Sequence, residues 1–384
     1  MLLDDLPTPS LLLDLDRLER NCDRMIRRAA ELGVRLRPHM KTAKSVEVGR
    51  LATREGAVGV TVSTLAEAEH FARAGFRDIT YAVAIAGPKV GPLAELQRQY
   101  GARISLLADS VAAVHDAERH AEAAGERLAL FIEIDSGGGR GGVTADGPEL
   151  PALGQAVRTS AWLSLAGVLT HAGQSYDASS IEEITRIAEE ERVAVTRAAD
   201  RLRALGLEVP AVSVGSTPTA LHARSLEGVT DMRPGVYTLF DLAQVALGSC
   251  MVDDIAVSVL ATVIGHNPRT GRMLIDAGAL ALSKDVSGNR GGRRVGYGLV
   301  CAATGGPTVD GLIVAEVHQE HGLVACEGAG DGLESRFPVG TRVRVLPNHA
   351  CLIAAPYDRY YLVRGTGARV EGEWAKVAGW SPAG

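Results

Sequence analysis

Few cysteines are present, and no pattern would link them. The five are odd in number, lie far apart and include no C-x-x-C pair: Cys22, Cys250, Cys301, Cys326 and Cys351. A disulfide framework is therefore not expected, and a reducing compartment such as the cytoplasm fits this usage. We expect all of them except Cys351 to be buried apolar residues.

The sequence also lacks features that mark other classes of protein. No apolar run is long enough to span a bilayer, and no basic segment precedes an apolar one at the start of the chain, so neither a membrane span nor a signal peptide is expected. The formal net charge is −6 and no basic stripe is visible, which argues against nucleic-acid binding. The 384 residues, 46% apolar and 22% charged, indicate a folded protein with one large domain and a smaller one.

Strand-like and helix-like segments alternate over the first part of the chain. Most of the predicted strands are separated by helical stretches: 34–40, 58–63, 78–85, 103–109, 128–135, 165–171, 211–216 and 229–233. Several are rich in Val, Ile and Leu, as parallel strands buried on both faces are. This alternation favours a closed (β/α)8 barrel over an open doubly wound sheet, which remains the alternative.

After about Gly248 the pattern changes. Short alternating strands with Gly-rich turns follow, with almost no helix, which indicates a mainly β domain. We expect residues 14–248 to form the barrel. Residues 249–384, joined by the strand-like start at 1–13, would form the second domain.

A lysine ends the first predicted strand. Lys41 would lie at the carboxyl end of a barrel strand, where such barrels place their catalytic groups. A lysine amine can form a Schiff base there, and loss of water can make it a base, which points to an aldehyde cofactor and amino-acid chemistry. Arg37, His39 and Lys44 add positive charge nearby, which suits a phosphorylated anion. The alternative is an ordinary solvated lysine.

The later strand ends are polar and Gly-rich. The seventh and eighth loops of such barrels often bind phosphate through backbone N–H groups and hydroxyls. Gly215, Ser216, Thr217 and Gly235 have the size and the donors for this role. The same residue types are also common in ordinary turns.

A second candidate site lies near the far end of the chain, in Pro347-Asn-His-Ala-Cys351. Positions i and i+2 of an extended segment face the same side, so His349 and Cys351 could bind one metal ion through an imidazole nitrogen and a thiolate. Two protein ligands leave room for water or substrate, as in Lewis-acid catalysis. The alternative is a buried cysteine beside a surface histidine.

In this order, these residues resemble the metal-dependent branch of the fold-type III pyridoxal-phosphate enzymes, which includes D-serine dehydratases, D-threonine aldolases and D-threo-3-hydroxyaspartate dehydratases. The resemblance runs from about Thr8 to Val363. It rests on the segments 37–42, 61–64, 132–135, 170–173, 214–219, 276–278, 319–322 and 347–351. Segments 61–64 and 214–220 look closest to the hydroxyaspartate dehydratases. Ala43 stands where many relatives have a histidine, a departure that bears on substrate choice.

The resemblance implies an alanine-racemase-type barrel that binds pyridoxal 5′-phosphate. Lys41 would hold the cofactor covalently and Tyr176 would line the catalytic site. The other cofactor contacts would come from Arg140 near the phenolic oxygen, His171 on the ring, Arg233 near the ring nitrogen, and Gly215, Ser216, Thr217, Gly235 and Val236 around the phosphate. His349 and Cys351 would bind the metal, and the thiolate favours Zn²⁺ over Mn²⁺ or Mg²⁺.

The implied substrate is a D-β-hydroxy-α-amino acid. Dehydration to a keto acid and ammonia is favoured, because dehydratases of this family tend to carry His-x-Cys whereas its aldolases carry His-x-Asp. Retro-aldol cleavage to glycine and an aldehyde is the alternative. A racemase would need a second base, for which Tyr297 is a candidate, and has no use for the metal. A non-enzymatic cofactor carrier would resemble the barrel alone. The family also implies a homodimer in which the partner's β domain completes each site.

Overall fold

The computed structural model of the protein describes residues 1–326 and 332–380. Parts of the expected second domain, 327–331 and 381–384, lie outside the described residues. Within the described ranges, no helix has the length and apolar character needed to cross a membrane. No disulfide joins any two cysteines there, and Cys326 is half-buried rather than buried as expected.

The chain forms two compact units. One contains Met1–Asp23 and Val236–Gly379, and the other contains Arg24–Gly235. The helix α1 (Leu15–Glu31) includes the first boundary between them. The expected domain boundary at residue 248 stays a prediction. The two compact units instead meet along the chain between residues 235 and 236.

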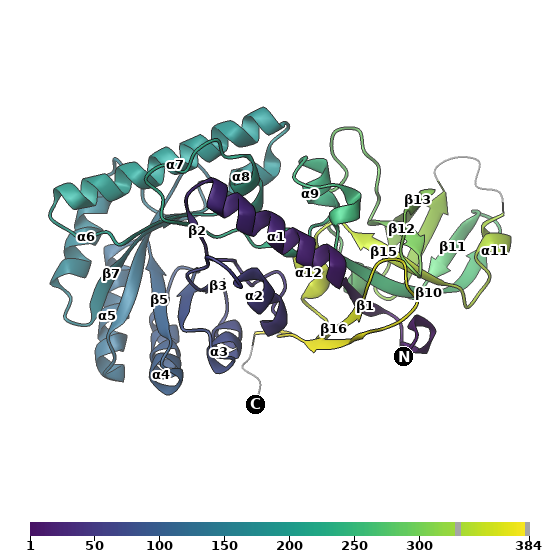
Figure 1. The fold of residues 1–384 in the computed structure, drawn as a ribbon, viewed down its shortest axis with the longest axis horizontal. Helices are drawn as coiled ribbons and strands as arrows, with labels where there is room; N and C mark the ends of the chain where they lie inside the picture. Colours follow the sequence, from purple (N-terminus) through teal and green to yellow (C-terminus); the bar gives the residue numbers. More distant parts are fainter. Residues whose placement is uncertain (327–331, 381–384) are drawn as a thin grey trace. The chain divides into compact units, whose positions relative to one another are not determined.

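A parallel sheet forms the core of the unit Arg24–Gly235 (Figure 1). Its strands in spatial order are β2 (Arg35–Leu36), β9 (Asp231–Met232), β8 (Ala211–Val214), β7 (Leu163–Thr170), β6 (Leu128–Ile134), β5 (Arg103–Ala108), β4 (Asp78–Tyr81) and β3 (Val60–Val62). The two end strands are joined as well, because Val58 N donates to Leu36 O and Thr61 N donates to Pro38 O. The sheet therefore closes, which confirms the predicted (β/α)8 architecture.

Helices connect successive strands and surround this sheet (Figure 1). They are α2 (Val46–Ala52), α3 (Leu65–Arg73), η2 (Gly87–Lys89), α4 (Val90–Tyr100), α5 (Val111–Ala124), α6 (Glu149–Thr159), η3 (Gly173–Asp177), α7 (Ile181–Ala204) and α8 (Thr217–His222). Thr64 and Ser110 cap α3 and α5 by accepting backbone N–H groups of Glu67 and Ala113, as hydroxyl side chains at helix N-termini commonly do.

The barrel strands end earlier than the sequence indicates. The predicted strand 34–40 is regular only at Arg35–Leu36, and the predicted strand 211–216 ends at Val214. The polar residues beyond these points leave the sheet because their backbone groups find other partners; Gly215 N, for example, donates to a side chain of α7. The chain segments that follow the strands are thereby available to form a site.

The unit Met1–Asp23 with Val236–Gly379 is built on a mainly antiparallel sheet. Its strands in spatial order are β11 (Arg272–Ile275), β14 (Gly322–Cys326), β13 (Thr308–Val317), β12 (Gly298–Ala302), β15 (Arg342–Pro347), β10 (Val257–Asn267), β1 (Ser10–Asp14), β16 (Arg359–Val363) and β17 (Gly372–Ala375). Because β11 also pairs with β10, the strands from β11 to β10 close into a small barrel. β1 pairs with β10 and β16, so the start of the chain joins this mainly β domain.

Short helices complete this unit. They are η1 (Leu3–Asp5), η4 (Val236–Thr238), α9 (Leu242–Ala246), η5 (Val252–Asp254), α10 (Ala279–Leu282), α11 (Leu333–Arg336) and α12 (Ala350–Ala354). Two segments that carry the resemblance are structural here. Asp276 Oδ1 accepts the backbone N–H of Thr262 at 2.7 Å, and a Cβ on Gly278 would collide with the carbonyl oxygen of His318. Segments 276–278 and 319–322 therefore shape the sheet.

Candidate active site

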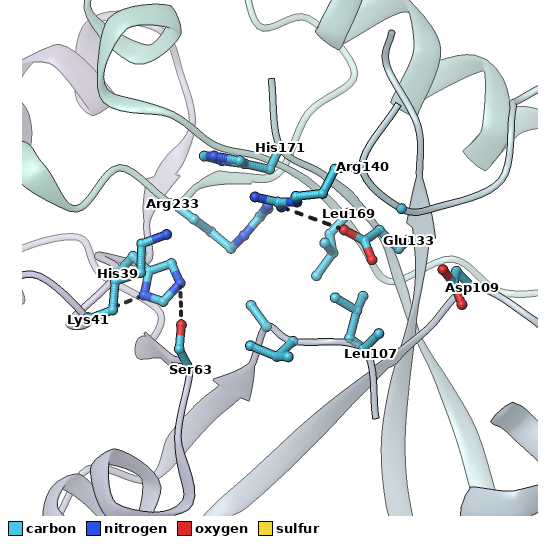
Figure 2. Close-up of a pocket in the computed structure, with 14 residues that line it drawn as sticks. His39, Lys41, Ser63, Leu107, Asp109, Glu133, Arg140, Leu169, His171 and Arg233 are labelled. Carbon is cyan, nitrogen blue, oxygen red and sulfur yellow. Dashed lines mark hydrogen bonds and ion pairs between the residues drawn. The ribbon is translucent and has the colours of Figure 1, made fainter. Parts of the chain in front are cut away.

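A cavity of ≈ 350 Å³ opens at the carboxyl ends of the barrel strands (Figure 2). Its polar lining consists of His39, Lys41, Ser63, Asp109, Glu133, Arg140, His171 and Arg233. Leu107 and Leu169 contribute to an apolar floor. The structure thus brings together four residues predicted from the sequence, Lys41, Arg140, His171 and Arg233, and adds Ser63, Asp109 and Glu133, which the sequence analysis did not single out.

Lys41 lies on a turn that the barrel closure fixes. Met40 N donates to Thr61 O at 2.8 Å, and Lys44 N closes the turn by donating to Met40 O at 2.7 Å. Within residues 1–326 and 332–380, no carboxylate forms an ion pair with the Lys41 amine, which lines the cavity. The amine is therefore placed to meet a ligand carbonyl.

The positive charge around Lys41 is smaller than the sequence suggests. Arg37 is buried and its guanidinium pairs with Asp78 and, at 3.6 Å, with Asp231. Lys44 forms an ion pair with the buried Glu67. Both charges are compensated within the fold, so the interpretation of a four-residue cationic cluster was wrong. Sequence alone could not reveal these partners, which lie on other elements.

Two histidines in the cavity are neutral. Burial, followed by the nearby charge of Lys41, lowers the pKa of His39 well below its ordinary range. For His171, burial and the charges of Lys41, Arg140 and Arg233 lower the pKa to about 3. The His171 ring lies 6.2 Å from the Tyr176 ring, centroid to centroid. A neutral, flat imidazole can lie against an aromatic ligand, which is the role predicted for His171.

The neutral His171 gives a testable pH dependence. Its pKa is about 3 in the folded protein and 6.5 ordinarily, so between these values the unfolded chain binds the extra proton and stability rises with pH. We expect the melting temperature of the cofactor-free protein to fall as the pH is lowered from about 7 to 5, and to fall less in His171→Gln. Calorimetry at several pH values measures this. Equal slopes for the two proteins would contradict the assignment.

Arg233 is a buried cation held in one orientation. Its guanidinium donates to Ser213 Oγ and to the carbonyl oxygen of Thr170. Burial lowers its pKa, and the charge of Asp231 opposes that effect. Because an arginine side chain stays charged in proteins, Arg233 presents a fixed donor to the cavity.

Arg140 lies on a loop that one carboxylate organises. Asp135 Oδ1 accepts the backbone N–H groups of Gly137, Gly138 and Gly139 at 2.9–3.2 Å. Arg140 itself is exposed, and its Nη2 lies 3.9 Å from Oε1 of Glu133 (Figure 2). Burial raises the pKa of Glu133, and the Arg140 charge opposes the rise. The pair orients the Arg140 guanidinium across the cavity.

The predicted phosphate-binding residues border the cavity and do not line it. The 215–219 turn lies beside Arg233, since a Cβ on Gly215 would lie 3.2 Å from Arg233 Cβ. Thr217 N is 3.4 Å from the hydroxyl of Tyr176, which brings η3 to the same turn. Gly235 lies beside His39, because a Cβ there would be 2.7 Å from His39 O. Val236 begins the other unit.

The predicted metal ligands meet where β15 gives way to α12. His349 is the N-cap of α12, and Cys351 lies in its first turn, so the assumption of an extended segment was wrong. The two side chains still lie close together, since interaction with Cys351 is one of the causes that raise the pKa of His349. His349 Nδ1 lies 3.1 Å from Asp285 Oδ2. Burial lowers the pKa of His349, but the hydrogen bonds to Asp285 and Cys351 outweigh it and raise the pKa to about 11.

These groups fit a metal with two protein ligands. Within the described residues, no three His, Cys, Asp or Glu side chains converge as a complete cluster. Because Asp285 is hydrogen-bonded to Nδ1 of His349, the Nε2 atom is the nitrogen available to a metal ion. Together with a Cys351 thiolate, it makes a nitrogen and sulfur donor set suited to Zn²⁺. The Asp285 carboxylate is itself fixed, because Ser287 N donates a hydrogen bond to its Oδ1 at 2.7 Å. Asp285 is a site residue that sequence reasoning missed, because it lies far from His349 along the chain.

Asp285 provides a prediction for the metal site. Partners that orient a metal-binding histidine typically contribute 10–100-fold to metal affinity, so Asp285→Asn is expected to weaken Zn²⁺ binding by about that factor. Competition with a chromogenic chelator measures it. Asp253→Asn, at a side chain that is 87% exposed, is the matched control. Unchanged affinity in Asp285→Asn would contradict the role.

Comparison with known proteins gives consistent relationships. A family model described as "Alanine racemase, N-terminal domain" matches residues 13–242, and one described as "Putative serine dehydratase domain" matches residues 256–363. The chain is 45% identical to a D-threo-3-hydroxyaspartate dehydratase of Delftia sp. (strain HT23) over 98% of both chains. It is 32% identical to a D-serine dehydratase of Dictyostelium discoideum over 94% of both.

Solved structures agree with these relationships. A variant of a D-threo-3-hydroxyaspartate dehydratase, described as a metal-free form, superimposes with a TM-score of 0.94 at 44% identity, covering 99% of this chain and 100% of that one. A D-threonine aldolase of Filomicrobium marinum gives a TM-score of 0.83 at 27% identity, covering 97% and 95%. The similarity extends over both units of the chain.

Proposed function

Because the chain belongs to the metal-dependent fold-type III pyridoxal-phosphate enzymes, the family of the D-serine dehydratases and D-threonine aldolases, we propose that it dehydrates D-threo-3-hydroxyaspartate. It is a pyridoxal-phosphate-dependent lyase of D-β-hydroxy-α-amino acids, and it uses a divalent metal. Dehydration gives a keto acid and ammonia. The choice of substrate rests on the 45% identity to the Delftia enzyme over nearly the whole of both chains.

The observation that carries the proposal is the cavity around Lys41. Its ≈ 350 Å³ lies in the range of small-molecule sites, and one lysine amine faces two arginines and two neutral histidines there. This lining suits an aromatic aldehyde that carries negative charge. Pyridoxal phosphate, when bound, supplies a conjugated ring that delocalises the charge developing at Cα of the amino acid.

The residues of the chain would then act as follows. Lys41 would hold the cofactor, and its amine would remove the proton from Cα of the substrate. His171 would lie against the ring without adding charge. Arg233, which keeps its protons, would donate toward the ring nitrogen. Arg140, oriented by Glu133, would face the phenolic oxygen. Tyr176 would line the site beside the 215–219 turn.

The metal residues would serve the β-hydroxyl. His349 and Cys351 would hold the ion, with Asp285 fixing the imidazole. A divalent metal supplies a Lewis acid that makes hydroxide a better leaving group. Zn²⁺ is the proposed ion because of the thiolate.

Retro-aldol cleavage is the second candidate, because the Filomicrobium D-threonine aldolase shares the fold over nearly the whole chain. Incubating the purified protein with D-threo-3-hydroxyaspartate, D-serine and D-threonine decides between them. We expect ammonia and keto acid in equal amounts, fastest from D-threo-3-hydroxyaspartate. Accumulation of glycine without ammonia would contradict the dehydratase proposal.

We also propose that the protein is a homodimer and that it works in the cytoplasm. The cysteine usage supports a reducing compartment, and the family resemblance supports the dimer. Light scattering coupled to size-exclusion chromatography measures the assembly, and a mass near 40.3 kDa, that of one chain, would contradict the dimer.

A further inference from the structure

Glu191 is a buried carboxyl group near the centre of α7 that the proposed chemistry does not use. Its side chain is 1% exposed. Its Oε1 accepts hydrogen bonds from the backbone N–H groups of Ala172 and Gly215, each at 3.0 Å. One oxygen therefore ties the residue that follows His171 to the start of the 215–219 turn.

The other oxygen of Glu191 begins a chain of buried hydroxyl groups. The consecutive contacts are Glu191 Oε2 to Thr219 Oγ1 at 2.8 Å, Thr219 Oγ1 to Ser216 Oγ at 2.7 Å, Ser216 Oγ to Ser175 Oγ at 3.0 Å, and Ser175 Oγ to Ala172 O at 2.7 Å. The chain ends on a carbonyl oxygen, which only accepts. The last proton of the chain must therefore belong to Ser175.

Counting protons shows what this chain requires. With an ionised Glu191, three hydroxyl protons must serve four contacts, so one contact has none. A proton on Oε2 of Glu191 removes the shortfall, since Glu191 then donates to Thr219, Thr219 to Ser216, Ser216 to Ser175, and Ser175 to Ala172. Unpaired contacts among buried polar groups are costly, so the geometry favours the neutral acid.

The surroundings of Glu191 agree with this count. Burial raises its pKa, while the hydrogen bonds from Gly215, Thr219 and Ala172 and the charge of Arg233 oppose the rise, and the net effect is upward. A neutral acid also places no negative charge beside a phosphate, where an ionised one would repel it.

We propose that Glu191, as a neutral carboxylic acid, is the positioning residue of the phosphate-binding turn: it accepts the backbone N–H of Gly215 and donates to Thr219, so that the hydroxyl chain through Ser216 and Ser175 is complete and the turn is held in one conformation to receive the cofactor phosphate. The proposal rests on the proposed function, because the phosphate is that of pyridoxal phosphate. It concerns cofactor binding and not the chemical step.

The test compares the affinity of the full-length, cofactor-free protein for pyridoxal phosphate and for pyridoxal, which lacks the phosphate. Glu191→Leu removes both acceptors and is expected to weaken pyridoxal phosphate binding by about tenfold or more, and pyridoxal binding by less than about twofold. Glu191→Gln keeps one acceptor oxygen and donates to Thr219, so both affinities should stay within about threefold of wild type. Absorbance titration measures them.

Two further variants keep the test decisive. Glu190→Gln, at an exposed neighbour on the same helix, should leave both affinities unchanged. Thr219→Val keeps the shape but breaks the hydroxyl chain, so it should also weaken pyridoxal phosphate selectively, and it decides the matter if Glu191→Leu fails to fold.

Several results would overturn the proposal. Equal loss of both ligands in Glu191→Leu would indicate a general structural role, and a loss in Glu191→Gln as large as in Glu191→Leu would mean that the ionised form is required. Unchanged pyridoxal phosphate binding in Thr219→Val would also overturn it. Wild-type protein that binds neither aldehyde would instead contradict the proposed function itself.

Discussion

Lys41→Ala is expected to lower turnover by about a thousandfold or more, because in the proposed mechanism one amine both holds the cofactor and removes the Cα proton. Among the residues that the structure describes, no other lysine lines the cavity. The neighbouring Lys44 is engaged by Glu67 and cannot replace it. The measurement is kcat for ammonia release at saturating pyridoxal phosphate, together with the visible absorbance of the bound cofactor, which should disappear.

Lys89→Ala is the control for this prediction. Lys89 lies on η2, does not line the cavity, and donates to Tyr81 at 3.1 Å, so its loss should leave both turnover and colour in place. If Lys41→Ala keeps the absorbance and the turnover of the wild-type protein, Lys41 does not have the proposed role.

Cys351→Ala is expected to keep the cofactor absorbance while turnover falls by about a hundredfold or more, because the metal loses one of two protein ligands. The proposed cofactor attachment is at Lys41, which belongs to the other compact unit. Elemental analysis of the dialysed protein should show metal well below one ion per chain.

Cys326→Ala provides a matched control, since Cys326 is also half-buried but lies in β14. It should retain metal and turnover. Full activity of Cys351→Ala in the presence of a chelator would contradict the metal site.

The barrel could be predicted because several of its parallel strands are short apolar runs. Segment 128–135, for example, became β6 (Leu128–Ile134), whose residues are almost all buried. The ends of strands were less predictable. Arg35–Leu36 is all that remains regular of segment 34–40, because the residues beyond it bond to chain segments that a local pattern does not reveal.

Residues at strand ends were the predictable part of the site, because one edge of a parallel barrel collects them. Charge partners were not predictable, since Asp78 and Glu67 neutralise Arg37 and Lys44 across other elements. A signal for Glu191 did exist. It lies four residues from both Ile187 and Val195, on the buried stripe of α7, where a glutamate is unexpected.

His349 and Cys351 come together although the local geometry predicted for them was incorrect. Their spacing suggests alternate residues of an extended segment, whereas His349 caps α12 and Cys351 lies in its first turn. The side chains meet because the chain turns sharply there. Asp285, which orients His349, required the fold of the whole unit to bring it close.

Borohydride reduction of the purified protein, followed by peptide mapping, tests the central claim most directly. Reduction fixes the cofactor to whichever amine carries it. We predict a single phosphopyridoxyl group, on the peptide that contains Lys41. Its appearance on Lys44, Lys89 or any other lysine, or the absence of any labelled peptide, would contradict the account.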